Sequence, residues 1–165
     1  MKVSAQEEYG LRCLLQMARS STLESVSIPE ISRAEGLSVP NVAKLMRILR
    51  LGGLVRSVRG QAGGYTLARP ADQISMEEVM RVLGGPVFGP GFCGRHAGLD
   101  GTCSHGGDCA VRPVWLKMQE MITAVLARTT LQNLMQSEQE MREFLSADSP
   151  CGGNGKKALA RTTGS

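Results

Sequence analysis

Residues 38–67 read SVPNVAKLMRILRLGGLVRSVRGQAGGYTL, an amphipathic segment followed by two β-rich segments around a glycine-rich turn. Ser38 stands at an N-cap position, and Gly52 interrupts the helical pattern. The residues after Gly52 predict two short strands, over 54–59 and 65–67, joined as a hairpin. Apolar residues of the first part recur at helical spacing, which predicts a buried stripe made of Val42, Leu45, Met46 and Leu49.

Two capping boxes precede this segment and predict two further helices. Ser4 with Glu7 begins a helix over about 5–19, and Ser27 with Glu30 begins a short second helix. The order is then helix, helix, turn, helix and hairpin, which is the order of a winged helix-turn-helix. Further along the chain, Ser75 is expected to cap a helix over 76–83 and Pro113 to open a long helix, before a last helical stretch capped by Thr129 or Thr130.

The charge of the chain is unevenly distributed. The net charge is only +4, yet residues 36–71 contain no Asp or Glu. The six basic residues of this stretch give it a local charge of +6, and they are Lys44, Arg47, Arg50, Arg56, Arg59 and Arg69. A basic block without acids is typical of a polyanion-binding surface, although a solvated basic face without a partner has the same composition.

The helix that begins at Ser38 is predicted to present polar side chains to the major groove of double-stranded DNA. Asn41 and Arg47 can bond bidentately to base edges, whereas Lys44 and Arg50 are expected at phosphates. The hairpin tip carries a further arginine, which can enter a minor groove. The predicted DNA-binding residues are therefore Ser38, Asn41, Lys44, Arg47, Arg50, Arg59 and Gln61.

Residues 84–109 contain nine glycines and three of the five cysteines, and they show no apolar periodicity. Such a segment cannot build its own core, so it is disordered or held by something else. Cys93, Cys103 and Cys109 follow the pattern C-x9-C-x5-C, and thiolates suit an iron–sulphur cluster or zinc. The wide spacing argues against zinc, which prefers closely spaced pairs. A loop with idle thiols is the alternative.

Three cysteines leave one ligand of a four-ligand site to be found. His96 and His105 are the local candidates, and Glu8 on the first helix is a third unless it pairs with Arg12 one turn later. Of the two remaining cysteines, Cys13 is predicted to be a small core residue and Cys151 lies in the tail, so neither is expected to be a ligand.

Over about residues 1–145 the chain resembles the Rrf-two family of bacterial transcription regulators. The resemblance rests on EYGLR at 8–12, on LVRSVRGQAGGYTLAR at 54–69, and on the three-cysteine loop before a long helix. It implies a homodimer in which the long helices cross. The fold expected is thus mainly α, a winged helix-turn-helix with a long C-terminal dimerisation helix. Its expected parts are the DNA-binding domain 1–83, the cluster-binding loop 84–112, the dimerisation helices 113–147 and a disordered tail 148–165.

The resemblance also implies an iron–sulphur cluster held by the three loop cysteines and a fourth ligand, which in some members comes from the partner's first helix. IscR-like members have a His three residues after the last cysteine, where this chain has Arg112. NsrR-like and RsrR-like members use a carboxylate of the first helix, where this chain has Glu8. The ligands implied are Cys93, Cys103, Cys109 and Glu8, with Glu8 as the labile one. The first cysteine spacing exceeds the x5 of IscR-like loops, so either [2Fe-2S] or [4Fe-4S] fits.

The function expected is a DNA-binding transcription regulator whose operator affinity is switched by the cluster in response to redox state, nitric oxide or cluster supply. The alternatives are a zinc-bound regulator, a thiol switch between Cys103 and Cys109, and a small electron-transfer protein. No Ser/His/Asp or phosphate-loop pattern occurs, so no enzyme is expected. No apolar run could span a membrane and no signal peptide is recognisable, which predicts a cytoplasmic protein, and the resemblance implies a bacterial one.

Overall fold

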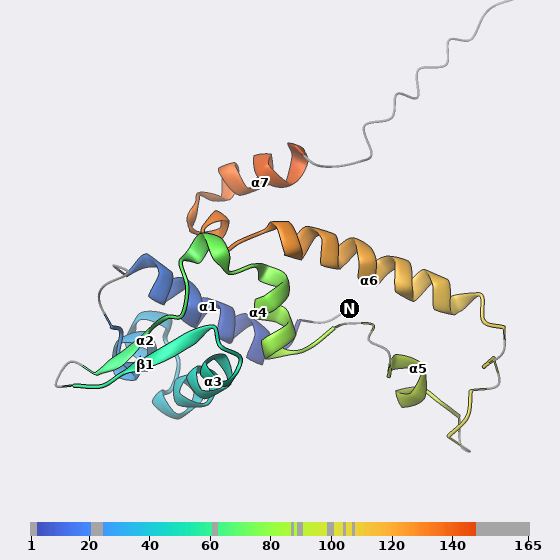
Figure 1. The fold of residues 1–165 in the computed structure, drawn as a ribbon, viewed down its shortest axis with the longest axis horizontal. Helices are drawn as coiled ribbons and strands as arrows, with labels where there is room; N and C mark the ends of the chain where they lie inside the picture. Colours follow the sequence, from blue (N-terminus) through green and yellow to red (C-terminus); the bar gives the residue numbers. More distant parts are fainter. Residues whose placement is uncertain are drawn as a thin grey trace, which may run out of the picture. The chain divides into compact units, whose positions relative to one another are not determined.

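A computed structural model of the chain describes residues 3–20, 25–60, 63–86, 88, 91–98, 101–103, 105–106 and 108–147 (Figure 1). Within these residues the chain forms seven α-helices, two short 3-10 helices and one two-stranded sheet. The described residues fall into two units, one that ends at Met135 and one that begins at Gln136. The predicted mainly α fold with a winged helix-turn-helix is confirmed. The tail predicted to be disordered, 148–165, lies outside the described residues.

Both predicted capping boxes form at the helix starts. Helix α1 spans Ala5–Arg19, and the Ser4 N–H donates to the Glu7 carboxylate at 2.7 Å while Ser4 Oγ accepts from the Glu7 N–H. Helix α2 spans Ile28–Glu35 and begins in the same way, with Ser27 and Glu30. The hydrogen bond with the Ser27 side chain lowers the pKa of the Glu30 carboxyl.

Helix α3, Val39–Leu51, is followed by the wing strands β1, Val55–Val58, and β2, Gly64–Leu67. The strands pair antiparallel, with Val55 opposite Leu67 and Val58 opposite Gly64. The hairpin is confirmed with slightly different strand ends. Ser38 holds the predicted N-cap position of α3, but its hydroxyl makes no capping hydrogen bond.

The core lies where α1, α2, α3, β1 and α4 meet. All four residues of the predicted α3 stripe are buried, together with Leu14 of α1 and Ile31 of α2. Cys13 is also fully buried, as predicted, and this burial raises the pKa of its thiol to about 11. Because this core is continuous from α1 to the wing, the helix that presents the basic side chains is held on a rigid base.

Helix α4 spans Met76–Leu83 and begins at Ser75, as predicted. Its end packs closely on α1, because Gly10 leaves room for Leu83 and the Gln6 side-chain amide donates to the Leu83 carbonyl at 2.5 Å. Helix α6, Val111–Arg128, runs along α4 and begins two residues before Pro113.

The last helical stretch is divided into two elements. Thr130 Oγ1 accepts from the Asn133 N–H at 3.3 Å, at the start of the 3-10 helix η2, Asn133–Met135. Helix α7, Glu138–Ala147, belongs to the second unit and begins with a capping box of its own. The sequence contains this box as Ser137 and Glu140, which the reading of the sequence missed. None of the described helices is long and apolar enough to cross a membrane.

Candidate functional site

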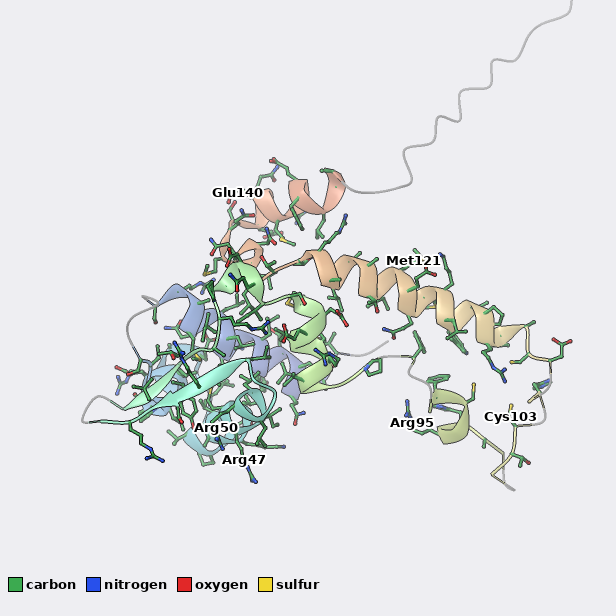
Figure 2. All side chains as sticks on the ribbon, viewed as in Figure 1. Arg47, Arg50, Arg95, Cys103, Met121 and Glu140 are labelled. Carbon is green, nitrogen blue, oxygen red and sulfur yellow. The ribbon has the colours of Figure 1, made fainter. Side chains whose placement is uncertain are left out.

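The outer face of α3 and the wing carry the predicted DNA-binding side chains. Ser38, Lys44, Arg47 and Arg50 are exposed, and Asn41 is half-buried in the first turn of α3. Figure 2 shows Arg47 projecting from α3 into open space, with Arg50 on the same helix. Among the described residues, none forms a hydrogen bond or ion pair with the side chains of Lys44, Arg47 and Arg50. Their charges therefore remain available to an anionic partner.

Two arginines of the basic stretch are in a different situation. Arg69 forms an ion pair with Glu78 of α4 at 2.6 Å, and Arg56 donates to Thr66 Oγ1 at 3.2 Å. The sequence stretch has no acids, but the fold brings Glu78 to it from outside. The free positive charge of this region is consequently smaller than the +6 counted along the sequence.

The wing turn follows β1. Arg59 is exposed there, next to Gly60, whose φ of 131° is a conformation that side-chain-bearing residues rarely adopt. Gln61, the other predicted wing contact, lies outside the described residues. The structure therefore places Arg59 at the start of the wing turn, with its side chain exposed to solvent.

The cysteine segment leads from α4 to α6. Cys93 lies in the short helix α5, Phe92–Arg95, and is half-buried; Cys109 is half-buried two residues before α6, and Cys103 is exposed. All three thiols are free, so Cys103 and Cys109 form no disulfide in this structure. An arginine also folds back onto the segment, because the Arg112 guanidinium donates to the Gly106 carbonyl at 3.3 Å.

The three candidates for a fourth ligand differ in their surroundings. Glu8 is exposed on α1, and the alternative in which it pairs with Arg12 is not observed, because Arg12 bonds instead to the Glu35 carboxylate at 2.8 Å. His96 Nδ1 lies 2.8 Å from the Phe92 carbonyl. A carbonyl oxygen can only accept, so Nδ1 is the donor in this hydrogen bond, which leaves Nε2 as the nitrogen that could bind a metal. His105 is exposed.

The donor set fits an iron–sulphur cluster in its chemistry, since it offers three free thiols together with an exposed carboxylate at Glu8 or an imidazole nitrogen at His96 or His105. In a single chain, the described residues do not bring three such groups together into one metal-holding cluster. A complete site therefore needs a rearrangement of the cysteine segment, a second chain, or both.

Aromatic rings pack together at α5, the short helix that contains Cys93, and this packing was not predicted from the sequence. Phe88 stacks on Trp115 of α6 with centroids 5.1 Å apart, and Phe92 lies edge-on to Phe88 at 5.3 Å. His96 lies 4.4 Å from the Phe92 ring. The available signal was the concentration of aromatic residues, since only six occur in the whole chain. The part of the cysteine segment at Phe88 and α5 is thus held by packing, which its glycine content did not indicate.

Helix α6 has an apolar row that no described residue covers. Val114 is 53% exposed, Met121 61% and Val125 41%, and Met118 lies in the same row. A row of this length and exposure is unusual for the surface of a protein that acts alone.

Comparison with known proteins identifies the regulator class. Residues 3–137 match Rrf2, described as an iron-dependent transcriptional regulator. The chain belongs to the Rrf2 family. This Rrf2 protein is 34% identical to an HTH-type transcriptional regulator of Mycobacterium tuberculosis strain H37Rv over 131 residues. The aligned region covers 79% of each chain. It is 31% identical over 139 residues to the HTH-type transcriptional regulator IscR of Xenorhabdus nematophila, covering 84% of this chain and 82% of that one.

Solved structures show the same fold. CymR (YrzC), the global cysteine regulator of B. subtilis, superposes with a TM-score of 0.67 at 29% identity, covering 82% of this chain and 96% of that one. IscR of T. potens superposes with a TM-score of 0.63 at 30% identity, covering 93% and 94%. The relatives are named as transcriptional regulators and not as enzymes, as the sequence predicted. The Rrf2 protein is therefore a DNA-binding transcription regulator.

Proposed function

We propose that this Rrf2 regulator binds its operator as a homodimer and that an iron–sulphur cluster switches its affinity. The observation that carries the proposal is the set of three free thiols on the segment between α4 and α6, together with the unpaired carboxylate of Glu8. The similarity to IscR proteins supports a cluster, whereas the similarity to CymR, a cysteine regulator, is the reason to test it directly.

DNA is read by α3 and the wing. Asn41 and Arg47 bond to base edges and so set the sequence preference, whereas Lys44, Arg50 and Arg59 bind phosphates and set the affinity. The hydroxyl of Ser38, which makes no capping bond, is free to bond to the DNA backbone. Gln61 acts with Arg59 in the wing.

The homodimer forms through the apolar row of α6. Burying Val114, Met118, Met121 and Val125 against the same row of a partner removes this surface from water. The pairing also gives the two recognition helices a fixed separation, which operator half-sites about 34–36 Å apart require.

Cys93, Cys103 and Cys109 hold the cluster, and Glu8 of the partner's α1 completes its ligand set. A bound cluster supplies a group that reacts with oxidants and nitric oxide. In this chain, α1 carries Glu8 on its surface and packs with its buried face on α3. A contact made or lost at Glu8 therefore acts on the helix that supports the recognition helix.

His96 is the second candidate for the fourth ligand, and one observation favours it. The hydrogen bond from Nδ1–H to the Phe92 carbonyl fixes the ring, as second-shell bonds do for metal-binding histidines. The two candidates are separated by the visible spectra of Glu8→Ala and His96→Ala proteins, purified without oxygen. The variant that lacks the true ligand changes its spectrum, and an unchanged Glu8→Ala spectrum refutes the role of Glu8.

Anaerobic purification followed by iron, sulphide and zinc counts tests the cluster itself. Iron and sulphide in equal amounts support the proposal. Zinc alone indicates a zinc-stabilised regulator. A metal-free protein whose DNA binding depends on redox state indicates a switch between Cys103 and Cys109. Absence of salt-dependent DNA binding would point to the electron-transfer alternative.

A further inference from the structure

The only tryptophan of the chain, Trp115, lies in the second turn of α6 beside the cysteine segment. Its ring stacks on Phe88 with planes inclined by 15°, and Phe92 lies 6.2 Å from it. Phe88 precedes α5 and Phe92 is its first residue. The three rings therefore attach α5, and with it Cys93, to α6 through aromatic contacts.

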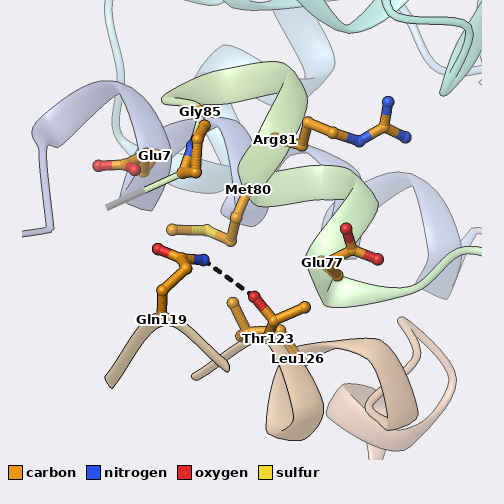
Figure 3. Close-up of a pocket in the computed structure, with 9 residues that line it drawn as sticks. Glu7, Glu77, Met80, Arg81, Gly85, Gln119, Thr123 and Leu126 are labelled. Carbon is orange, nitrogen blue, oxygen red and sulfur yellow. Dashed lines mark hydrogen bonds between the residues drawn. The ribbon is translucent and has the colours of Figure 1, made fainter. Parts of the chain in front are cut away.

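A hydrogen bond strengthens this attachment. The Phe88 N–H donates to Gln119 Oε1 at 2.9 Å, and Gln119 Nε2 donates in turn to Thr123 Oγ1 at 2.9 Å, the bond drawn in Figure 3. Trp115, Gln119 and Thr123 recur at every fourth position, so they form one row along α6. Because an α-helix turns about 100° per residue, this row and the exposed row of Val114 and Met121 lie on different faces.

The chain that leads from α4 to α5 is also held at its start, where it contacts α1. Leu83 accepts a hydrogen bond from Gln6, and a Cβ at Gly84 would lie only 2.1 Å from the Glu7 carboxylate, so α1 and this glycine are in close contact. Between the two ends lies a pocket, whose walls include Met80 of α4 and Leu126 of α6 (Figure 3). The chain that enters the cysteine segment is thus anchored on α1 at residues 83–84 and on α6 at residue 88.

We infer that Trp115 is a positioning residue, which docks the Cys93-bearing helix α5 on α6 before any metal is bound. The inference rests on the proposed function in one respect, namely that Cys93 is a ligand. It goes further than the proposed function, because Trp115, which is not a ligand, sets the position of the ligand Cys93. The docking holds the Cys93 thiol near α6 before a metal binds, while Cys103, ten residues later in the cysteine segment, remains exposed.

Thiol labelling of the full-length protein, reduced and freed of metal, measures the docking. Site-by-site mass spectrometry gives the labelling rates of Cys93 and Cys103. In Trp115→Leu, the rate at Cys93 relative to Cys103 rises about five-fold, the factor expected when the local opening of α5 no longer breaks the stack on Phe88. Trp115→Phe retains a ring and restores most of the wild-type ratio. Leu116→Ala, at the adjacent exposed position of α6, leaves the ratio unchanged.

Phe88→Leu removes the other half of the stack without altering α6, so it tests the docking even if Trp115→Leu does not fold. We expect the same rise at Cys93, together with stronger quenching of Trp115 fluorescence by acrylamide. An unchanged Cys93 ratio in both variants, or an equal rise at both cysteines, overturns the inference. Iron and sulphide counts on the same proteins separate the two proposals. If the wild-type protein contains no iron but the variants show the expected rise at Cys93, the cluster is refuted and the docking is supported. If iron is present but the labelling ratio is unaltered, only the docking is refuted.

Discussion

Removal of one free arginine from α3 should change the salt dependence of DNA binding by a calculable amount. Arg50 is exposed near the end of α3, and among the described residues its guanidinium has no partner. If it binds a phosphate, a homodimer loses two phosphate contacts in Arg50→Ala. Each phosphate contact contributes about −0.9 to the slope of log Kobs against log salt concentration, so the slope becomes about 1.8 less steep.

The structure provides a matched control in the same basic stretch. Arg69 carries the same charge, but its guanidinium is occupied by Glu78 at 2.6 Å. We therefore expect Arg69→Ala to leave the slope of the wild-type protein unchanged. Both substitutions lower the net charge by one, so a difference between them cannot come from the charge of the protein as a whole.

The assay is fluorescence anisotropy on a duplex obtained by in vitro selection with the wild-type protein. Titrations at several salt concentrations give the slope. Over a fourfold increase in salt, the wild-type protein should lose about 12-fold more affinity than Arg50→Ala, because four raised to the power 1.8 is about 12. A slope that is the same for wild type and Arg50→Ala refutes the assignment of Arg50. A slope change of about 0.9 refutes the homodimer on DNA.

Three further predictions concern the dimer, the core and the wing. Met121→Glu places a charge in the exposed apolar row of α6 and should give a monomer in analytical ultracentrifugation, whereas Ala127→Glu on another face should remain a dimer. Burial raises the pKa of the Cys13 thiol to about 11, above its ordinary 9.0, so the free energy of unfolding should fall between pH 9 and 11. Denaturant titrations should show a loss of up to about 1.4 kcal/mol per pH unit, absent in Cys13→Ala. Gly64→Ala puts a Cβ 2.7 Å from the Val26 carbonyl oxygen, and thermal unfolding should show a loss of about 1–3 kcal/mol; an unchanged melting temperature would contradict this close contact.

Local patterns made the DNA-binding half predictable. The capping boxes at Ser4 and Ser27 fixed two helix starts, and the spacing of Leu45 and Leu49 identified the buried side of α3. These signals act over a few residues, so the sequence contains all the information they need. Ser38 shows the limit, because a residue suited to capping stands at the N-cap without making the bond.

Contacts between distant parts of the chain were not predictable in the same way. Arg69 forms an ion pair with Glu78, and Arg12 pairs with Glu35 and not with Glu8. Both pairs depend on how helices pack, which the periodicity of a single helix does not specify. The packing of Phe88 on Trp115 is of the same kind, since the two residues lie on opposite sides of a glycine-rich segment. For the candidate site this matters most, because the ligand types could be read from the sequence but their placement could not.

Helix α6 connects the parts of the molecule that the proposed switch requires. One of its rows holds the cysteine segment through Trp115 and Gln119, and another leaves Met121 exposed for a partner. Backbone hydrogen bonds join each turn of an α-helix to the next, so α6 moves as a unit. A change that alters the docking of α5 must therefore be transmitted to the exposed row, or else break the aromatic stack. In a homodimer paired through that row, the first outcome changes the separation of the two α3 helices, and an operator with fixed half-site spacing responds to that change.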